Sequence, residues 1–387
     1  MSRLNVGNLF NENEDGGPVI SGISTFSSQY YFVPPSGSTA ERPLNPGEGM
    51  IRFNTDSGHL EYYAGTHWAD VITNNNELGD QNNTNSSGGT GHRGLIAGGY
   101  SPSPGDLIDR IEYISISTLG NSQDFGNLVA ATRLAGSCAS STRGIFAGGA
   151  SPAPTKTNKI DVVTIASTGN ASDFGNLTVT RNQLSGCSNQ TRGLFASGDA
   201  PSAITNVIDY ITIASNGDAQ DFGDLLAAAE QTTSTSNSVR GLWAGGTTPS
   251  FSDVIQYVTI SSTGNAQDFG DLITARNILA SCSNSTRGLF GAGNTPGNDA
   301  LNSIEFVTIA STGNAQDFGD LTVGRRAGQA ACSSPIRGIF AGGDGAPSLT
   351  NVIDFVTILS TGNASDFGDL IGPVTQNCAC SNGHGGL

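Results

Sequence analysis

Charged residues are scarce in this chain of 387 residues, and histidine and lysine are the rarest of the ionisable types. Asp, Glu, Lys and Arg together make up 13% of the sequence, and there are four histidines. The only lysines are Lys156 and Lys159. The formal charge of −16 predicts a surface that repels nucleic acid phosphates and anionic membranes, so neither is an expected partner.

Catalytic and metal-binding patterns find little support in this composition. The histidines are His59, His67, His92 and His384, and we cannot place a Ser/His/Asp nucleophilic set among them. A copper site would need histidine and tyrosine ligands inside the repeats described below, which are almost free of histidine. We therefore expect no enzyme activity, no metal and no cofactor.

Long apolar runs are also missing. No run approaches the ~20 residues of a membrane span, and the first residues lack the apolar core of a secretory signal. We therefore expect no membrane insertion and synthesis in a cytoplasm, where the six cysteines begin as thiols. Glycine, in contrast, is abundant at 53 residues, which suits short strands and tight turns and predicts an all-β fold.

One phrase, Arg-Gly-[Leu/Ile]-aromatic-Ala-Gly-Gly, recurs six times with small departures. Successive copies are 47 to 50 residues apart. A fixed period of this size is typical of a propeller, solenoid or array. The copies begin at Arg93, Arg143, Arg192, Arg240, Arg287 and Arg337.

Each repeat divides into four strand-like pieces. In the third repeat, piece one is Gln183–Asn189, piece two Gly193–Gly198 and piece three Val207–Ala214. Piece four follows a Gly-Asn or Gly-Asp turn and reads Asp-Phe-Gly-[Asn/Asp]-Leu. Four strands in each repeat predict a propeller blade close to the kelch period.

The ends of the array predict a closed ring. The first repeat begins directly with piece two at Arg93, and the last is followed by Gln376–Asn382, a sixth copy of piece one. If this C-terminal strand pairs beside Gly94–Gly99, two exposed sheet edges disappear. We therefore expect residues 93–387 to form a six-bladed propeller closed by its C-terminal strand.

Three further segments precede the repeats. Residues 1–48 are predicted to be an extended attachment arm that orders against a partner. Residues 49–73 read as a small β meander, in which Phe53, Tyr62 and Trp68 are the expected packing residues. Residues 74–92 are polar and of low complexity, so we expect a flexible linker.

Both parts of the chain resemble proteins of tailed phages. The phrases Ser38-Thr-Ala-Glu-Arg-Pro43, Gly47-Glu-Gly-Met-Ile-Arg-Phe-Asn-Thr55 and Leu60-Glu-Tyr-Tyr-Ala-Gly-Thr-His-Trp68 resemble a small β module of fibre and tail-associated proteins. The repeats resemble kelch blades, with Phe at the usual Trp position, and are similar to kelch-like repeats in structural proteins of cyanobacterial phages.

The resemblance implies a virion protein that is made in the host cytoplasm. It would contact other virion proteins through the arm and form a homo-oligomer, with a trimer as one form. We expect a tail fibre or tail-associated protein whose propeller binds a host-surface glycan or a neighbouring subunit. A capsid-decorating or assembly subunit, a lectin or glycan hydrolase, and a bacterial scaffold unrelated to phages remain alternatives.

A ring of cysteines is the first candidate site. Five copies of piece one have a cysteine at the same position. Thr235 occupies that position in the remaining copy, and Cys378 is additional. Packing of small residues near a crowded axis is favoured over a thiolate metal site, because six-fold spacing does not suit tetrahedral zinc. The five cysteines are Cys138, Cys187, Cys282, Cys332 and Cys380.

The six repeat arginines are the second candidate. Piece three carries an acidic residue in five repeats and Gln256 in the fourth. We expect a repeated ion pair between these acids and the repeat arginines. A ring of guanidinium groups that binds an anion is the alternative. The five acids are Glu112, Asp161, Asp209, Glu305 and Asp354.

The loops between pieces two and three are the third candidate, because they vary in sequence and leave the same face. Loop variation on a rigid scaffold is a common source of binding function. The loops are Tyr100–Leu107, Ala150–Lys159, Asp199–Asn206, Thr247–Asp253, Asn294–Asn302 and Asp344–Asn351. The ligand contacts expected in them are Tyr100, Ser151, Asp199, Thr247, Asn294 and Asp344.

Overall fold

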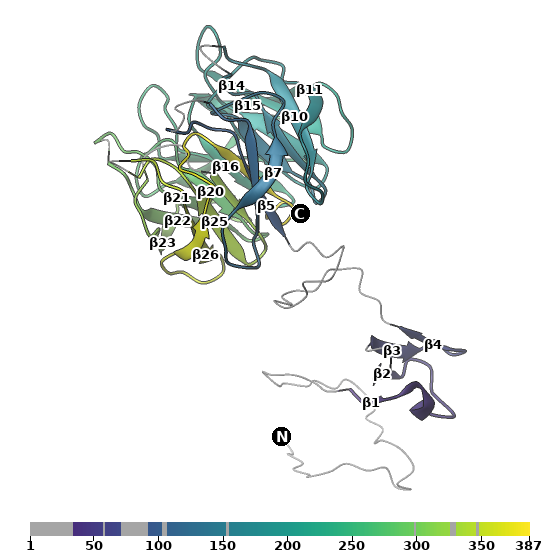
Figure 1. The fold of residues 1–387 in the computed structure, drawn as a ribbon. Coiled ribbons are helices and arrows are strands. Elements are labelled where there is room, and N and C mark those ends of the chain that lie inside the picture. The colour runs from purple at the N-terminus through teal and green to yellow at the C-terminus, as the bar shows by residue number, and fades with distance from the viewer. Residues whose placement is uncertain are drawn as a thin grey trace. The chain divides into compact units, whose positions relative to one another are not determined.

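The computed structural model describes residues 34–56, 59–70, 92–102, 107–151, 155–297, 299–325, 330–345 and 348–387. The chain divides into two compact units, Met1–Asn76 and Glu77–Leu387 (Figure 1). Residues 74–91 of the predicted linker and residues 1–33 of the predicted arm lie outside the described residues. Strands and turns make up the described part, which contains a single short 3-10 helix.

No helix in the described ranges is long and apolar enough to cross a membrane.

The first unit contains one small sheet with strand order β1-β2-β3-β4. The predicted meander is present as an antiparallel set, and β1 adds a fourth strand parallel to β2. That extra strand and the short helix η1 come from the range that the sequence assigned to the arm. The elements are β1 (Ser36–Gly37), η1 (Thr39–Glu41), β2 (Ile51–Asn54), β3 (His59–Tyr63) and β4 (Trp68–Asp70).

The packing predicted for this sheet is wrong for two of its three aromatic residues. Phe53 and Tyr62 are 37% and 40% exposed. The opposite face is buried instead, and there the carboxylate of Glu61 lies within 3.4 Å of the Arg52 guanidinium and bonds to Arg42. Alternation along a strand puts one set of side chains on each face, and here the charged set is the buried one.

In the second unit, the four strands predicted for each repeat are present. The described strands form six four-stranded antiparallel sheets, which we number 1 to 6. Sheet 1 contains β5 (Arg93–Ala97), β6 (Arg110–Ser115), β7 (Gln123–Asn127) and β28 (Cys378–Ser381). Sheet 2 contains β8 (Gly136–Ala139), β9 (Arg143–Ala147), β10 (Lys159–Thr164) and β11 (Ser172–Asn176), and sheet 3 contains β12 (Ser185–Ser188), β13 (Arg192–Ala196), β14 (Thr205–Thr212) and β15 (Gln220–Ala229).

The remaining three sheets repeat this order. Sheet 4 contains β16 (Thr233–Ser236), β17 (Arg240–Ala244), β18 (Val254–Thr259) and β19 (Gln267–Asp271). Sheet 5 contains β20 (Ala280–Ser283), β21 (Arg287–Gly291), β22 (Ser303–Thr308) and β23 (Gln316–Asp320). Sheet 6 contains β24 (Ala330–Ser333), β25 (Arg337–Ala341), β26 (Val352–Thr357) and β27 (Ser365–Asp369).

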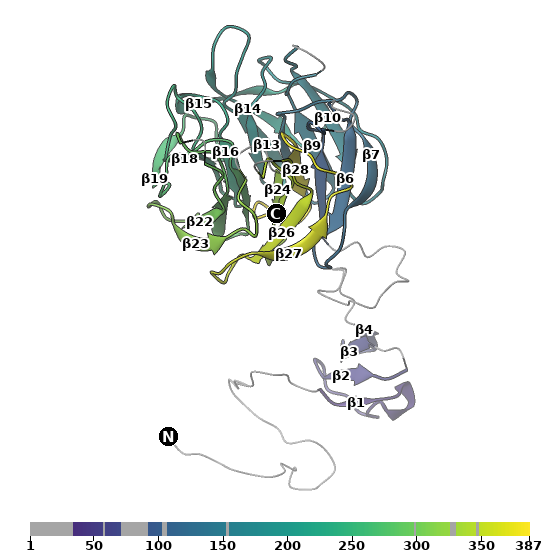
Figure 2. The ribbon, with the colours of Figure 1, turned by 60° about the vertical axis from the view of Figure 1, so that its left-hand side comes forward.

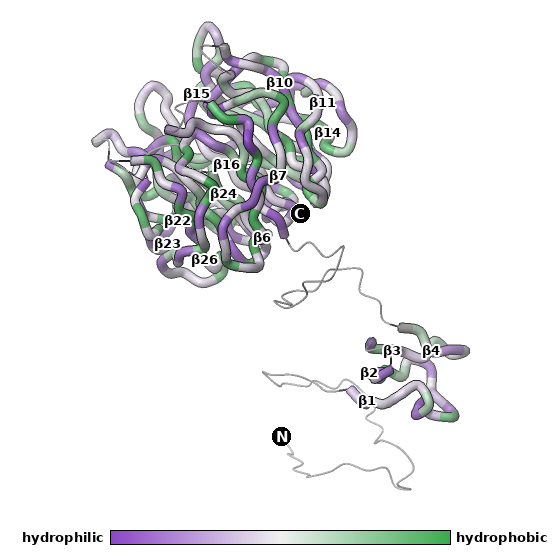
Figure 3. Tube along the Cα trace, in the orientation of Figure 1, coloured by the Kyte–Doolittle hydropathy of each residue, from purple (hydrophilic) through white to green (hydrophobic). Residues whose placement is uncertain are grey.

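The sheets follow one another in cyclic order (Figure 2). The inner strands lie side by side in the sequence β8, β12, β16, β20, β24 and β28, and β28 returns to β8. An apolar cluster fills each space between consecutive sheets. Figure 3 shows hydrophobic and hydrophilic positions interspersed along the trace of these sheets. The last cluster joins Ile114 of sheet 1 to Phe367 of sheet 6. This arrangement, which we call the ring, is compatible with a β-propeller.

The predicted pairing of the C-terminal segment is confirmed. Strand β28 runs antiparallel to β5, with Cys378 opposite Ala97 and Ser381 opposite Gly94. Sheet 1 is therefore built from both ends of the second unit, and its inner strand is the last strand of the chain.

Candidate functional site

The inner strands enclose an axial channel, and one end of it is rimmed by residues in an unusual backbone conformation. Each rim residue lies two positions before an inner strand and has a φ of 52° to 61°. Consecutive rim residues are joined by backbone hydrogen bonds of 2.9 to 3.1 Å. Non-glycine residues rarely adopt this conformation, and no glycine marks it in the sequence, which is why the rim was not predicted. The described rim residues are Leu134, Gln183, Gln231, Ile278 and Gln376.

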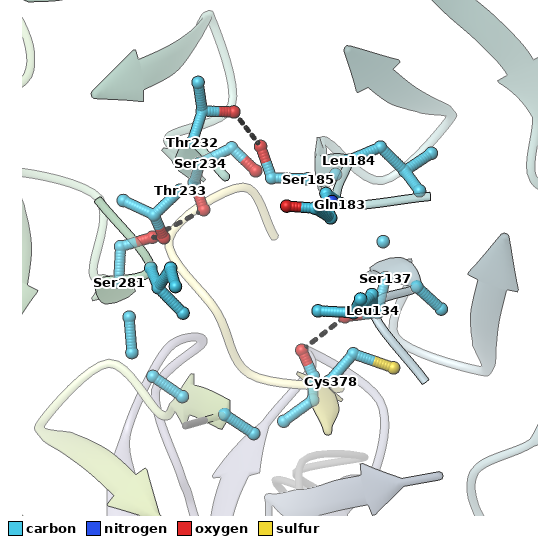
Figure 4. Close-up of a pocket in the computed structure, with 18 of the residues that line it drawn as sticks. Leu134, Ser137, Gln183, Leu184, Ser185, Thr232, Thr233, Ser234, Ser281 and Cys378 are labelled. Carbon is cyan, nitrogen blue, oxygen red and sulfur yellow. Dashed lines mark hydrogen bonds between the residues drawn. The ribbon is translucent and has the colours of Figure 1, made fainter. Parts of the chain in front are cut away.

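A cavity of about 130 Å³ lies inside this rim (Figure 4). Hydroxyl groups in or next to neighbouring inner strands bond to each other along its wall. The Ser185 hydroxyl lies 2.9 Å from that of Thr232, and the Thr233 hydroxyl lies 2.7 Å from that of Ser281. Ser137 donates to the carbonyl of Ala379 at 2.7 Å. The hydroxyls are thus held in fixed orientations by the sheets.

The wall of this cavity combines polar side chains with apolar ones such as Leu134 and Ile278, and it carries no ionised group in the described lining. Its described lining contains no acid, lysine, arginine or histidine. Gln183 Oε1, Ser234 Oγ and both amide atoms of Asn377 are buried there without a hydrogen-bond partner in the described protein. Such donors and acceptors suit an uncharged polar ligand.

The other end of the channel is closed by the C-terminal tail, Gly383–Leu387. Figure 2 shows the C-terminus near the middle of the ring. His384 Nε2 lies 2.9 Å from the carbonyl oxygen of Ala139 and 3.2 Å from Ser188 Oγ. A side chain on Gly386 would place its Cβ 1.9 Å from the Ser188 carbonyl oxygen, so only glycine fits. Burial lowers the pKa of His384 to about 4, and the imidazole is neutral in the channel.

The tail contacts a ring of serines at the ends of the inner strands. Five inner strands end in a serine whose hydroxyl donates to the carbonyl of the preceding strand at 2.6 to 2.7 Å. The sixth position is Ala139, which has no hydroxyl. His384 bonds at this interruption of the serine ring. The serines are Ser188, Ser236, Ser283, Ser333 and Ser381.

The structure places the five repeat cysteines and Thr235 at equivalent inner-strand positions, with Cys378 two residues from Cys380. All six cysteines are buried free thiols. Burial raises the pKa of each, to about 12 for Cys332, so the thiolate is disfavoured. The described residues contain no group of three or more His, Cys, Asp or Glu side chains that could hold a metal ion.

The expected ion pair between the repeat arginines and the acids of piece three is wrong. Each repeat arginine instead donates to a backbone carbonyl of the next sheet at 3.0 to 3.2 Å, from Arg93 to Ile165 and finally from Arg337 back to Ile116. In five sheets its guanidinium also lies 4.5 to 5.0 Å from the centre of an aromatic ring of its own sheet. The arginines tie neighbouring sheets together and do not converge on an anion.

The acids of piece three also connect consecutive sheets, through a backbone N–H of the sheet before. Asp161 accepts from Val129 at 3.0 Å, and Glu112 accepts from Ile371 at 3.0 Å. Gln256 accepts from Leu226 through its amide oxygen at 2.7 Å. A carbonyl oxygen is sufficient for this bond, which is why a neutral residue is tolerated in sheet 4.

The six loop residues expected to contact a ligand lie at the bases of their loops. Asp199, for example, bridges to Asn182 and Ile204 through its backbone and pairs with Lys156 at 2.6 Å. Tyr100, Thr247 and Asn294 form similar backbone bridges to the segments that lead to the rim, Asp344 bridges to Leu349, and Ser151 donates to Thr155. The loops therefore begin beside the rim of the axial cavity.

No protein-family model matches the chain, and no curated protein matches it either.

Proposed function

We propose that the chain is a non-enzymatic structural and binding protein of a tailed-phage virion, built as a six-bladed kelch-like propeller. The small module and the arm attach it to other virion proteins as part of a tail fibre or tail-associated complex. The loops and the axial cavity form the binding face, and the ligand is a host-surface glycan. Support comes from the sequence resemblance and from the cyclic order of the six sheets.

The observation that carries the binding role is the axial cavity. Its fixed hydroxyls and amides, with no ionised side chain in the described lining, match the donors and acceptors of a sugar ring. The same lining offers no acid and base pair for glycoside hydrolysis. This favours a lectin-like role over a hydrolase.

The test replaces rim amides with side chains that the rim already contains. Gln183→Leu and Gln231→Ile reproduce the apolar residues found at Leu134 and Ile278, so the variants should fold. We expect them to bind fewer ligands on a glycan array than the unmodified chain. Gln190→Leu, at the other end of the inner strands, is the matched control and should bind normally.

Two results would contradict the proposal. Equal glycan binding by the rim variants and the control would exclude the axial cavity as the site. Absence of the chain from purified virions, as measured by mass spectrometry and antibody labelling of intact particles, would exclude the virion role. Incorporation without any effect on adsorption would support a capsid-decorating or assembly subunit instead.

A further inference from the structure

Arginines from the connections between sheets fill a repeated slot in the ring. Arg181 is completely buried between sheets 2 and 3. Its guanidinium donates to the carbonyls of Val207 and Phe195 at 2.7 and 3.0 Å, and lies 3.0 Å from the Asp209 carboxylate. The slot is therefore a small set of carbonyls beside one acid of piece three. Two further connections repeat the pair, Arg276 with Glu305 at 2.9 Å and Arg325 with Asp354 at 2.8 Å.

The connection from sheet 1 to sheet 2 has a threonine at this position. The Thr132 carbonyl accepts a hydrogen bond from Gly99 at 2.8 Å, just as the Arg181 carbonyl accepts one from Gly149 at 2.9 Å. The two residues are therefore equivalent. The next residue, Arg133, donates to Gln376 Oε1 at 3.1 Å and so is directed to the rim.

A cavity of about 440 Å³ lies where the guanidinium would be. Its lining includes Thr132, Phe146, Lys159 and Asp161. By strand register, Phe146, Lys159 and Asp161 correspond to the three residues that hold Arg181. Val129, in the same wall, is 60% exposed, so solutes can reach the cavity.

The acid in this cavity lacks the cation that its equivalents have. Among the five acids at this position, four lie 2.6 to 3.0 Å from an arginine, with Arg110 serving Glu112. Asp161 accepts one backbone hydrogen bond, from Val129, and forms no ion pair within the described residues. Burial raises the pKa of Asp161, Asp173 opposite raises it further, and Lys159 opposes this. A bound cation would relieve this cost.

We propose that the cavity between sheets 1 and 2 binds the guanidinium group of another molecule, held by the Asp161 carboxylate and the Phe146 carbonyl. The motive is that the chain places its own guanidinium beside the equivalent acid in three other connections, and in two of them the guanidinium also donates to the equivalent carbonyls. The ligand is a small guanidinium compound or an exposed arginine side chain of a peptide. This site is separate from the axial cavity.

The test is calorimetric titration of the full chain with two probes, agmatine for a free small molecule and N-acetyl-L-arginine methylamide for a peptide side chain. We expect dissociation constants on the order of millimolar, as for a single partly exposed ion pair. The tighter probe identifies the source. N-acetyl-L-citrulline methylamide, which is neutral and nearly isosteric, should bind about tenfold more weakly.

Two variants locate the site. Thr132→Arg should fill the slot from within, so that probe binding is lost and the melting temperature rises. Asp161→Asn keeps the acceptor for the Val129 N–H and should weaken probe binding by about tenfold. Val239→Arg adds the same charge at a turn residue that is 55% exposed, and should bind the probes as the unmodified chain does.

Equal binding of the arginine and citrulline probes would overturn the proposal. So would unchanged binding by a folded Thr132→Arg variant. If that variant does not fold, an Asp161→Asn variant with unchanged affinity would overturn it instead. Glycan binding by the rim is measured separately, so failure here leaves the proposed function intact.

Discussion

At the residue scale, one contact explains two of the repeated positions together. The glycine of each Arg-Gly pair faces the third residue of the preceding sheet's inner strand. A Cβ on Gly193 would lie 2.6 Å from Cys138 Sγ, and one on Gly94 would lie 2.5 Å from Cys332 Sγ. All six contacts follow the cyclic order of the sheets, and Thr235 replaces the cysteine against Gly288. The inner cysteines and the glycines therefore set the spacing between sheets.

This contact predicts coupling between Gly193 and Cys138. Gly193→Ala should lower the free energy of unfolding by about 2 kcal/mol through overpacking. Adding Cys138→Ala removes the sulfur and should recover at least about 1 kcal/mol relative to the sum of the single effects. Denaturant unfolding of the two single variants and the double variant gives the coupling.

Gly217→Ala is the control for this cycle, because a Cβ there meets nothing within 4 Å. It should change stability by less than about 0.5 kcal/mol. Additive effects of Gly193→Ala and Cys138→Ala would show that the glycine is required for another reason, such as its contact with Ile211.

Other residue-scale features could not be predicted from the sequence. The spacing of the acids and repeat arginines suggested that they pair, but spacing does not show which groups face each other across two sheets. Three of the acids pair instead with arginines of the connections, such as Asp209 with Arg181, and these arginines do not belong to the repeated phrase. Likewise, the φ of Gln183 and its rim equivalents is fixed by bonds between sheets and leaves no glycine as a signal.

At the element scale, the positions of the strands were predictable from the sequence, but the face that each strand buries was predictable only in part. The repeated phrases locate all four strands of a sheet because each has a plain alternation and a turn signal. In the small module, the same alternation gave the wrong buried face. Glu61 there has arginine partners from β2 and from the segment after η1, and alternation alone does not reveal such partners.

The C-terminal tail carries no sequence pattern that predicts its position, although it closes one end of the channel. It follows β28 directly and fills the end of the channel away from the rim. Its only titratable side chain among the described residues is His384, buried beside Ala139 and Ser188. The tail therefore couples closure of the channel to the charge of one imidazole.

We expect this coupling to appear as a pH dependence of stability. The pKa of His384 is about 4 in the fold against 6.5 as its ordinary value. Between these values the unfolded chain binds the proton and the folded chain does not, so stability falls as the pH drops from 6.5 towards 4. His384→Gln should remove this part of the slope in melting temperature against pH.

Both proteins contain the same carboxylates, so subtracting the His384→Gln curve of melting temperature against pH from that of the unmodified chain removes the contribution of the carboxylates. His67→Gln, in the small module, is the control and should keep the slope of the unmodified ring. A His384→Gln curve parallel to that of the unmodified chain between pH 4 and 6.5 would show that the tail is not held in the channel through this residue.

At the scale of the whole molecule, closure of the ring depends on the two ends of the second unit. Within sheet 1, the β28–β5 pairing joins the two ends of the unit. Three sets of contacts then cross the seam between sheets 6 and 1. They are the Arg337 bond to Ile116, the Ile371 bond to Glu112 and the close approach of Cys332 and Gly94. Each of these three repeats a contact found between the other sheets, so the seam is held by the same contacts as the continuous parts of the ring.

Because the seam is equivalent to the other junctions, the chain order across it should be interchangeable. In sheet 3, two residues connect Asn189 to Arg192. Asn382 and Arg93 occupy the same places in sheet 1, with Arg93 N donating to Asn382 Oδ1 at 2.7 Å. A chain ordered as residues 1–91, 376–382, one glycine and then 92–375 would therefore make the same two-residue turn with the glycine and His92.

This permuted chain should fold with one cooperative transition, and its melting temperature should lie within about 5 °C of that of a chain lacking only residues 383–387. Both proteins lack the tail, so the comparison isolates the order of the strands.

A chain that lacks residues 376–387 also loses β28, leaves β5 as an exposed edge and should unfold at a much lower temperature or aggregate. Equal melting temperatures for this chain and the one lacking only residues 383–387 would contradict the role of the C-terminal strand. Each sheet of the ring is stabilised by its neighbours on both sides, so loss of one inner strand removes two interfaces, whereas a new connection between the same strands removes none.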